Sequence, residues 1–304
     1  MTLSTPLTTW LSLQGYGLVT RTLFGADTPP TILRARFDRA ASVSRETLKR
    51  KFPTLSFESH SFEGLDIEAV RATTEPRCSI LHLHGGAFLF GSPSTYRRRA
   101  MRFSHRCNAE VFVPDYRLAP EHPYPAALED AIAAYHWLRR HRPERPIIVT
   151  GDSAGGGLAL SLLVTLRDRE AVLPAGAVLL SPWTDLYISG RSVEANGERD
   201  LWLSRAHLAS WARHYVGNAD PRSPLLSPVF ADLAGLPPLL LFAGEHEVLL
   251  DDARRVVERA LAAGTDARLV VGKAMQHDWP LTLPWLRESQ SAWSTIGAFV
   301  EARD

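Results

Sequence analysis

Short runs of consecutive apolar residues recur along the chain from residue 78 onwards, and they predict buried strands. The runs are CSILHLH (78–84), EVFVPD (110–115), PIIVTG (146–151), GAVLLS (176–181), PLLLFAG (238–244) and ARLVVG (267–272). Because they are apolar throughout, they are typical of parallel strands that helices cover on both faces. Segments of helical composition lie between or after them, at 95–108, 125–141, 251–263 and 286–302. This alternation predicts an α/β fold with a mostly parallel central sheet.

Two regions interrupt the alternation of strand and helix. Residues 1 to about 60 contain helical pieces rich in aromatic residues, including Trp10, Tyr16 and Phe24, and residues 187–217 form an insertion between two strands. We expect both regions to form a helical cap over the carboxyl end of the sheet, where open α/β sheets bind ligands. With no internal repeat and no low-complexity linker, residues 1–304 are predicted to form a single catalytic domain.

Ser153 lies between glycines at the end of a predicted strand, in the segment PIIVTGDSAGGGLALSLLV. A strand that turns sharply into a helix holds its apex residue in a strained conformation, with the side chain above the sheet. A side chain at Gly151 or Gly155 would collide with the neighbouring backbone. The motif G-x-S-x-G in this context predicts that Ser153 is a nucleophile, and the alternative is a serine in a tight structural turn. We expect Asp152 beside it to orient neighbouring loops.

A glycine-rich stretch after another predicted strand suggests a site for a developing oxyanion. His84 is followed by Gly85, Gly86 and Ala87. Glycines let backbone N–H groups face a ligand, so the amides of Gly85 and Gly86 are expected to act with that of Ala154. A structural glycine-rich loop is the alternative. His82 and His84 share one face of the strand, but no third ligand is near in sequence, so no metal is expected.

A serine nucleophile needs a base, and eleven histidines compete for that role. His277 follows the last predicted strand in VGKAMQHDWP, in a loop at the carboxyl end of the sheet. The acid must then lie between Ser153 and His277 in the chain. Asp251 and Asp252 suit the cap and first turn of the following helix. Glu247 in the preceding loop is therefore the preferred acid, with Asp251 as the alternative.

Composition and charge narrow the function classes. Hydrophobic residues make up 45% and charged residues 22%, and the net charge of +1 does not favour nucleic-acid or membrane-surface binding. The densest basic cluster, Arg97 to Arg99, is expected to be a solvated helix face. Two cysteines, an N-terminus unlike a signal peptide and no apolar run long enough to span a membrane favour a cytoplasmic protein.

Four ordered motifs resemble those of the bacterial hormone-sensitive lipase family of α/β-hydrolases. They are HGGAF, GDSAGG, GEHEVLLDD and MQHDW, and DYRLAPEHPYPAALED (115–130) is similar to a further family segment. The resemblance covers roughly residues 60–304 and implies an α/β-hydrolase fold with a cap formed by the N-terminal segment and the insertion. Ala87 replaces the third glycine of the family's HGGG element. The family's acid position, often Asp, corresponds to Glu247.

These observations predict a serine carboxylesterase that needs no cofactor. Ser153 would attack the ester carbonyl and His277 would take its proton, so activity should rise with pH through about 6 to 7 as the imidazole becomes neutral. The resemblance suggests short- to medium-chain acyl esters. An amidase or deacetylase with the same triad and a non-catalytic small-molecule receptor on the same fold are the alternatives. A homodimer through an edge strand or the terminal helix is a further expectation.

Overall fold

One sheet organises the part of the chain that the computed structural model describes, which is residues 12, 14–15, 17, 20 and 24–303. In this part eight strands lie in the order β1-β2-β4-β3-β5-β6-β7-β8. The strands from β4 across to β8 are parallel, and β1 and β2 are antiparallel to their neighbours. A mostly parallel sheet is therefore confirmed. The expected helical residues Trp10 and Tyr16 lie outside the described residues.

The six predicted strands are present, each within one residue of its expected ends. They are β3 (Cys78–Leu83), β4 (Ala109–Pro114), β5 (Ile147–Asp152), β6 (Gly176–Leu180), β7 (Leu239–Gly244) and β8 (Ala267–Gly272). The five from β3 to β7 are buried at every position, whereas the last strand, β8, lies at the sheet edge and is partly exposed. Continuous apolar runs thus form the covered centre of the sheet, as the pattern indicated.

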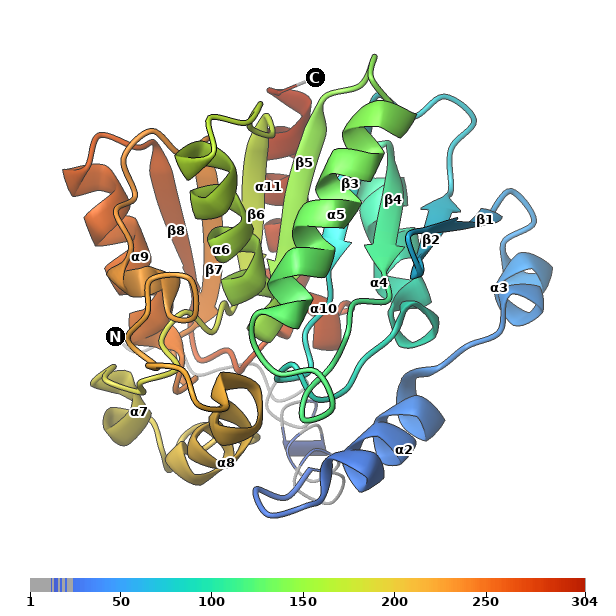
Figure 1. The fold of residues 1–304 in the computed structure, drawn as a ribbon. Coiled ribbons are helices and arrows are strands. Elements are labelled where there is room, and N and C mark those ends of the chain that lie inside the picture. Colours follow the sequence, from blue (N-terminus) through green and yellow to red (C-terminus); the bar gives the residue numbers. More distant parts are fainter. Residues whose placement is uncertain (1–11, 13, 16, 18–19, 21–23, 304) are drawn as a thin grey trace.

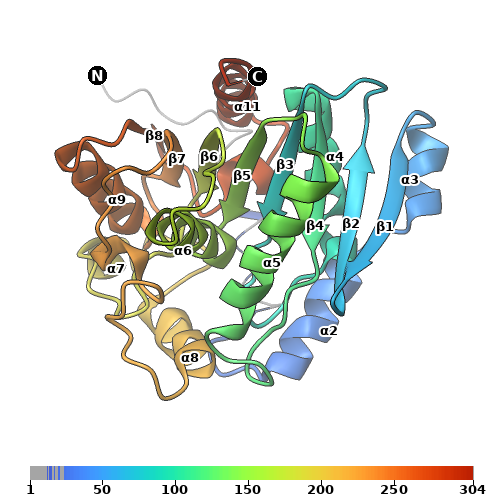
Figure 2. The same ribbon diagram turned by 45° about the horizontal axis from the view of Figure 1, so that its top comes forward.

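Helices cover both faces of the sheet (Figure 1). On one face lie α5 (Ala126–His141), α6 (Ala154–Asp168) and α9 (Leu250–Ala262), and behind the sheet lie α4 (Pro93–Cys107) and α11 (Arg287–Glu301). Figure 2 shows the same two layers after rotation. Pro125 was expected as the first residue of a helix, but it is the N-cap of α5, one position earlier. Both cysteines are buried and form no disulfide.

The antiparallel hairpin of β1 (Ser56–Phe62) and β2 (Leu65–Arg71) was not predicted. Glu63 and Gly64 connect the strands and both have positive φ, 51° and 85°. Such a two-residue turn matches the twist of a hairpin, and a glycine in it is a recognisable signal. Because β1 begins at Ser56, the sheet starts within the residues that were expected to form the cap.

Three helices gather at the carboxyl end of the parallel strands, below the sheet in Figure 1. They are α2 (Pro30–Ala41), α7 (Ser192–Ala195) and α8 (Arg205–Val216). Aromatic rings join these segments: Phe24 lies 5.9 Å from Phe37 and 5.5 Å from Trp202, centroid to centroid. The helix α3 (Arg45–Lys51) lies beside β1 instead (Figure 2). In the described residues, no helix is long and apolar enough to cross a membrane.

Candidate active site

Ser153 lies at the apex of the turn between β5 and α6. Its backbone has φ 51° and ψ −123°, a conformation that costs free energy in any residue with a side chain. A Cβ on Gly151 would lie 2.2 Å from the carbonyl oxygen of Gly155, and one on Gly155 would lie 2.0 Å from that of Leu83. The collision predicted for side chains at these two glycines is confirmed, and it explains how so sharp a turn fits against the sheet.

A cavity of about 380 Å³ opens above this turn. Ser153, His277 and Gly86 line it together, although they follow three different strands. Aromatic side chains from the N-terminal segment, the oxyanion loop (Gly85 to Phe90) and the insertion form much of its wall: Phe24, Phe37, Phe90, Trp202 and Trp211. Serine chemistry needs a serine, an imidazole and backbone donors at one cavity, and here these three groups line the same one.

The imidazole of His277 is buried between two carboxyl groups. Its Nδ1 lies 3.8 Å from Oε2 of Glu247, and its Nε2 lies 3.4 Å from Oδ2 of Asp278. Neither ring nitrogen makes a hydrogen bond to a described residue. In substrate-free enzymes catalytic hydrogen bonds are often long and tighten in the complex. Glu247 therefore stands where an acid could orient this imidazole.

Ser181 connects the acid to the loop that carries the histidine, and sequence reasoning missed it. Its hydroxyl donates to Oε2 of Glu247 at 2.7 Å and accepts from the backbone N–H of Asp278 at 3.0 Å. Ser181 directly follows β6, between the strands that precede the nucleophile and the acid. A polar residue at the carboxyl end of a central strand is the signal that could have identified it.

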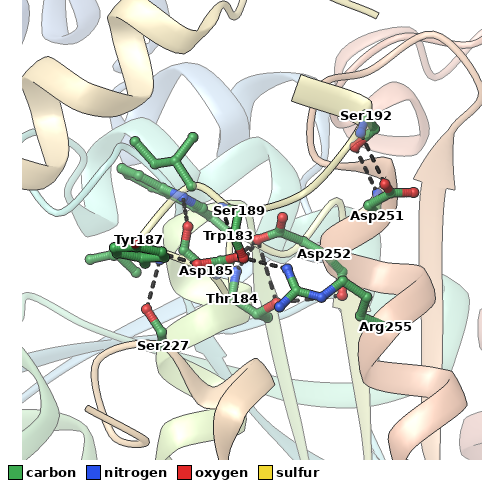
Figure 3. A network of polar contacts seen from close by, with 12 residues as sticks. Trp183, Thr184, Asp185, Tyr187, Ser189, Ser192, Ser227, Asp251, Asp252 and Arg255 are labelled. Carbon is green, nitrogen blue, oxygen red and sulfur yellow. Dashed lines mark hydrogen bonds and ion pairs between the residues drawn. The ribbon is translucent and has the colours of Figure 1, made fainter. Parts of the chain in front are cut away.

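Asp251, the alternative acid, is bonded elsewhere. One of its carboxylate oxygens accepts the backbone N–H of Ser192 at 2.9 Å, and Figure 3 shows the pair at the edge of a polar network. Both Asp251 and Asp252 lie in the first turn of α9, as predicted. Asp252 accepts the backbone N–H groups of Thr184 and Asp185 (Figure 3). Its neighbour Asp251 thus ties the insertion to α9.

Burial shifts the protonation equilibria of the histidine and the acid. It lowers the pKa of His277 to about 3 and raises the pKa of Glu247 well above its ordinary value. Both shifts favour the neutral form, because a low-dielectric environment penalises charge. The expectation of an ordinary histidine titrating between pH 6 and 7 therefore changes: the imidazole stays neutral, and competent as a base, at lower pH.

Gly85 does not present its amide to the cavity, which corrects one of the predicted oxyanion donors. Its N–H donates to the hydroxyl of Tyr96 at 2.8 Å and to Oδ1 of Asp152 at 3.1 Å. The amides of Gly86, Ala87 and Ala154 donate to no described residue. The chain turns here with positive φ at Gly86 (123°) and Ala87 (56°), and both residues line the cavity together with Ser153.

Asp152 holds this loop, as expected of the residue beside the serine. Besides Gly85, it accepts a hydrogen bond from the Tyr96 hydroxyl at 2.6 Å and lies 3.3 Å from Nε2 of His82. Although burial opposes ionisation, His82, Arg99 and Tyr96 together lower the pKa of Asp152. Burial and the charge of Asp152 raise the pKa of Asp278 well above its ordinary value. The pKa values of these two neighbouring carboxyl groups are thus shifted in opposite directions.

The two strand histidines have structural partners. His82 Nδ1 lies 2.8 Å from the hydroxyl of Thr150, and His84 stacks on Tyr116 with ring centroids 4.1 Å apart. Burial lowers the pKa of His84 to about 4. No group of three or more possible metal ligands occurs in the residues that the structure describes.

The basic cluster is more than a solvated helix face. Arg97 binds the buried carboxylate of Glu68 at 2.7 Å, whereas Arg98 and Arg99 line the cavity together with Arg102 from the next turn. The prediction was wrong because one side of α4 packs on the sheet and another side lines the cavity. A run of like charges in the sequence does not indicate which side of a helix faces a cavity.

Known proteins share this architecture. A family model described as "alpha/beta hydrolase fold" matches residues 80–281. The "Acetyl-hydrolase" of Streptomyces hygroscopicus is 42% identical over 234 residues, 77% of this chain and 78% of the relative. The crystal structure of an esterase from the bacterial hormone-sensitive lipase family matches with a TM-score of 0.85 and 38% identity, over 96% of this chain and 98% of that one. A crystal structure of EstE5-PMSF matches with a TM-score of 0.86 and 34% identity, over 97% and 98%.

Proposed function

The chain belongs to the hormone-sensitive lipase family of α/β-hydrolases and is a carboxylesterase, and on this basis we propose that Ser153, His277 and Glu247 form its catalytic triad. The family resemblance and the fold expected from the sequence are confirmed. The observation that carries the proposal is the shared cavity: the strained serine and the buried imidazole line one space, with Glu247 on the far side of the ring.

In the proposed reaction, the Ser153 hydroxyl attacks the ester carbonyl and His277 Nε2 takes its proton. Glu247 accepts the Nδ1–H and stabilises the imidazolium as it forms, and the positive charge of the imidazolium in turn favours the carboxylate that burial disfavours. The imidazolium then protonates the leaving alcohol, and an acyl-enzyme remains on Ser153. Water, deprotonated by the same imidazole, attacks the acyl carbonyl and releases the acid, which returns the serine to its starting state.

We assign the oxyanion to the backbone amides of Gly86, Ala87 and Ala154. The amide of Gly85 is used within the protein, so Ala87 replaces it in the proposed hole. Ala154 is the first residue of α6, where an N–H has no acceptor inside the helix and adds to the positive end of the helix dipole. Loss of one oxyanion donor typically costs about 3 to 4 kcal/mol of barrier.

The wall of the cavity supports short- to medium-chain acyl esters as substrates. Its aromatic side chains offer an apolar surface, and the volume of about 380 Å³ suits a small ligand rather than a long lipid chain. Trp202 and Trp211 of the insertion both line the cavity, and Trp211 is buried as well. A series of nitrophenyl esters from acetate to palmitate tests this, and maximal kcat/KM at long chains would contradict it.

Ser153→Ala tests the nucleophile. Turnover of nitrophenyl butyrate should fall by several orders of magnitude, about a millionfold by analogy with a dissected serine triad. Ser161→Ala on the same helix is the control, because that hydroxyl donates only to the Gly157 carbonyl within α6. A fluorophosphonate probe should add its mass to Ser153 in the wild type and not in Ser153→Ala. Unlabelled wild-type protein would instead favour the receptor alternative.

The acid is assigned by comparing Glu247→Gln with Asp251→Asn. The first should lower kcat by about a thousandfold or more, since removal of a triad acid costs about 10⁴. The second should mainly loosen the contact between α9 and Ser192. The relative named "Acetyl-hydrolase" makes a deacetylase the second candidate. Nitrophenyl acetate and nitroacetanilide, which share an acyl group, distinguish ester from amide cleavage.

A further inference from the structure

One side of the cavity carries an excess of positive charge. Arg98, Arg99 and Arg102 of α4 line it, and the carboxyl groups in its lining are those of Asp152 and Asp278. Burial and the charge of Asp152 raise the pKa of Asp278 well above its ordinary value, which disfavours the negative charge of this carboxyl. The positive charge of Arg99 lowers the pKa of both carboxyls, so it acts towards them. The positive charges of Arg98 and Arg102 are therefore in excess over the carboxyl groups of the cavity lining.

Arg98 and Arg102 are held by backbone oxygens rather than by carboxylates. Arg98 donates to the Ala41 carbonyl at 3.4 Å and Arg102 to the Leu281 carbonyl at 3.4 Å. Within the described residues neither forms an ion pair, in contrast to Arg97 on the same helix, which binds Glu68. These weak bonds fix the two side chains beside the cavity and leave N–H donors for another acceptor.

Burial makes the charge on Arg102 costly. Burial, together with the positive charges of Arg99 and Arg106, lowers the pKa of Arg102 to about 10. Its guanidinium lies 5.8 Å from the centre of the Trp293 ring, a weak compensation. A cation in this position gains stability from an anion that enters the cavity, because the two groups then share the cost of leaving water.

The arginines lie on the side of the cavity where the alcohol part of an ester would leave. The leaving oxygen must reach His277, which protonates it, so this part of the substrate extends along the histidine side. The segment after His277 forms that wall through Leu281, Thr282 and Pro284, and Arg102 bonds to Leu281. Trp285 ends the wall and is 65% exposed, which places it at the opening.

We propose that Arg98 and Arg102 form an anion-binding subsite, and that the preferred substrates are esters whose alcohol part carries a carboxylate or phosphate. The ester carbonyl lies at Ser153, the acyl group lies against the aromatic wall, and the anionic end of the alcohol contacts the guanidinium groups beside Trp285. Arginine suits this role because its planar fork of donors matches an oxyanion. The inference rests on the proposed esterase function.

Two matched pairs of esters test the subsite. The first compares 4-acetoxybenzoate with 4-acetoxybenzamide, which differ in the charge of the alcohol part. The second compares the phenyl half-ester of adipic acid with its amide, which differ in the charge of the acyl part. We expect about a tenfold higher kcat/KM for acetoxybenzoate than for its amide, equivalent to one charge-assisted hydrogen bond. No such preference is expected in the second pair.

Removal of the two charges should abolish the preference. In Arg98→Gln/Arg102→Gln, the kcat/KM ratio within the first pair should fall about tenfold, mainly through a higher KM for the anion. Arg106→Gln is the control, since Arg106 belongs to the same helix but binds Gln290 outside the cavity. 4-Acetoxyphenyl phosphate, compared with 4-acetoxybenzoate, shows whether phosphate or carboxylate is bound better. Either result supports an anion subsite.

Three outcomes would overturn the inference: equal or lower kcat/KM for acetoxybenzoate, a preference only in the acyl pair, or an equal loss of preference in Arg106→Gln. The last result would mean that the overall field of α4 steers anions. Failure of the proposed function gives a different result, because neutral phenyl acetate would then also resist hydrolysis. Active enzyme without charge preference removes the subsite alone.

Discussion

Among the single residues, Tyr96 has the role of positioning the oxyanion loop. Its hydroxyl joins Gly85 of the oxyanion loop to Asp152 beside the nucleophile, with both contacts buried. Since Gly86 and Ala87 follow Gly85 directly, a fixed Gly85 fixes the direction of their amides. The oxyanion hole therefore depends on a phenol that does not itself touch the proposed oxyanion.

Tyr96→Phe should lower kcat about tenfold and change KM less, because a hydrogen bond to a charged group is worth about 1.5 to 3 kcal/mol and the loop keeps its Asp152 contact. Tyr135→Phe is the matched control: its buried hydroxyl donates to the Val172 carbonyl at 2.7 Å, far from the cavity lining. Both variants should lose stability in thermal unfolding, but only the first should lose turnover. A KM effect alone in Tyr96→Phe would refute the positioning role.

The protonation of His277 predicts an unusual acid limb of the pH profile. Burial lowers its pKa to about 3, so the neutral form persists as the pH falls and activity is lost only towards that lower value. A histidine with an ordinary pKa near 6.5 would be about 97% protonated at pH 5. We expect kcat/KM for a neutral ester to be largely retained at pH 5.

Measurement of kcat/KM between pH 4 and 8 checks this prediction, with circular dichroism at each pH to show that the chain is folded. A half-maximal value near pH 6.5 in folded protein would show that the imidazole is solvated in the working enzyme. A neutral, uncharged substrate is essential here, since an anionic one would add its own titration and that of its subsite.

At the level of elements, the insertion fixes the loop that carries the acid. Asn196, which caps the end of α7, donates to the backbone carbonyls of Glu245 and Glu247 at 3.0 and 2.9 Å. Asp200, four residues later, accepts the backbone N–H of Val248 at 2.9 Å. The insertion therefore holds the loop of the proposed acid in addition to lining the cavity.

Asn196→Ala should therefore reduce activity as well as stability. The side chain is buried, and its loss leaves the Glu245 carbonyl without a donor among the described residues, at about 1 to 3 kcal/mol, while the Glu247 carbonyl keeps only the Leu250 N–H at 3.4 Å. We expect kcat to fall several-fold and the unfolding temperature to drop by several degrees. Asn218→Ala, an exposed position after α8, is the control and should change neither. Reduced stability with full kcat would mean that the loop holds the acid without help from the insertion.

Sequence patterns predicted the elements better than the contacts between them. The apolar runs located β3 to β8, since a covered parallel strand needs apolar side chains on both faces. Ser153 was identifiable from the sequence because its sharp turn leaves no room for a side chain at Gly151 or Gly155. Ser181, Tyr96 and Asn196 were not, because each acts through a partner on a distant element. Likewise, only the hydrogen bonds that the Gly85 N–H donates to Tyr96 and Asp152 indicate that Gly85 anchors the loop and is not an oxyanion donor.

The whole molecule explains why two distant segments line the cavity. The parallel strands end at one edge, so every chain segment that must reach the substrate lies there. Arg34 of α2 shows how the N-terminal part is attached: it donates to the Leu89 carbonyl at 2.7 Å and to the Glu121 carboxylate at 2.8 Å. Glu121, which lies in the 115–130 segment, thus has Arg34 as a structural partner. The same arginine bonds α2 to the oxyanion loop.

The exposed edge of the sheet at β8 predicts association of two copies. A terminal strand presents unpaired N–H and C=O groups, and here Val271 is 39% exposed beside partly exposed Leu269 and Val270. The opposite edge, β1, carries charged and polar residues that discourage pairing. We therefore expect a homodimer in which β8 pairs with its copy and extends the sheet across the two subunits.

Light scattering after size-exclusion chromatography tests this association across a dilution series. Val271→Lys should shift the mass from about twice to once the chain mass, because it adds charge to the pairing edge without entering the core. Val172→Lys is the control, since Val172 is 61% exposed in the turn after α6 and should leave the mass unchanged. A monomeric wild type at micromolar concentration would refute the dimer. Esterase activity retained in the Val271→Lys monomer would show that each subunit contains a complete site.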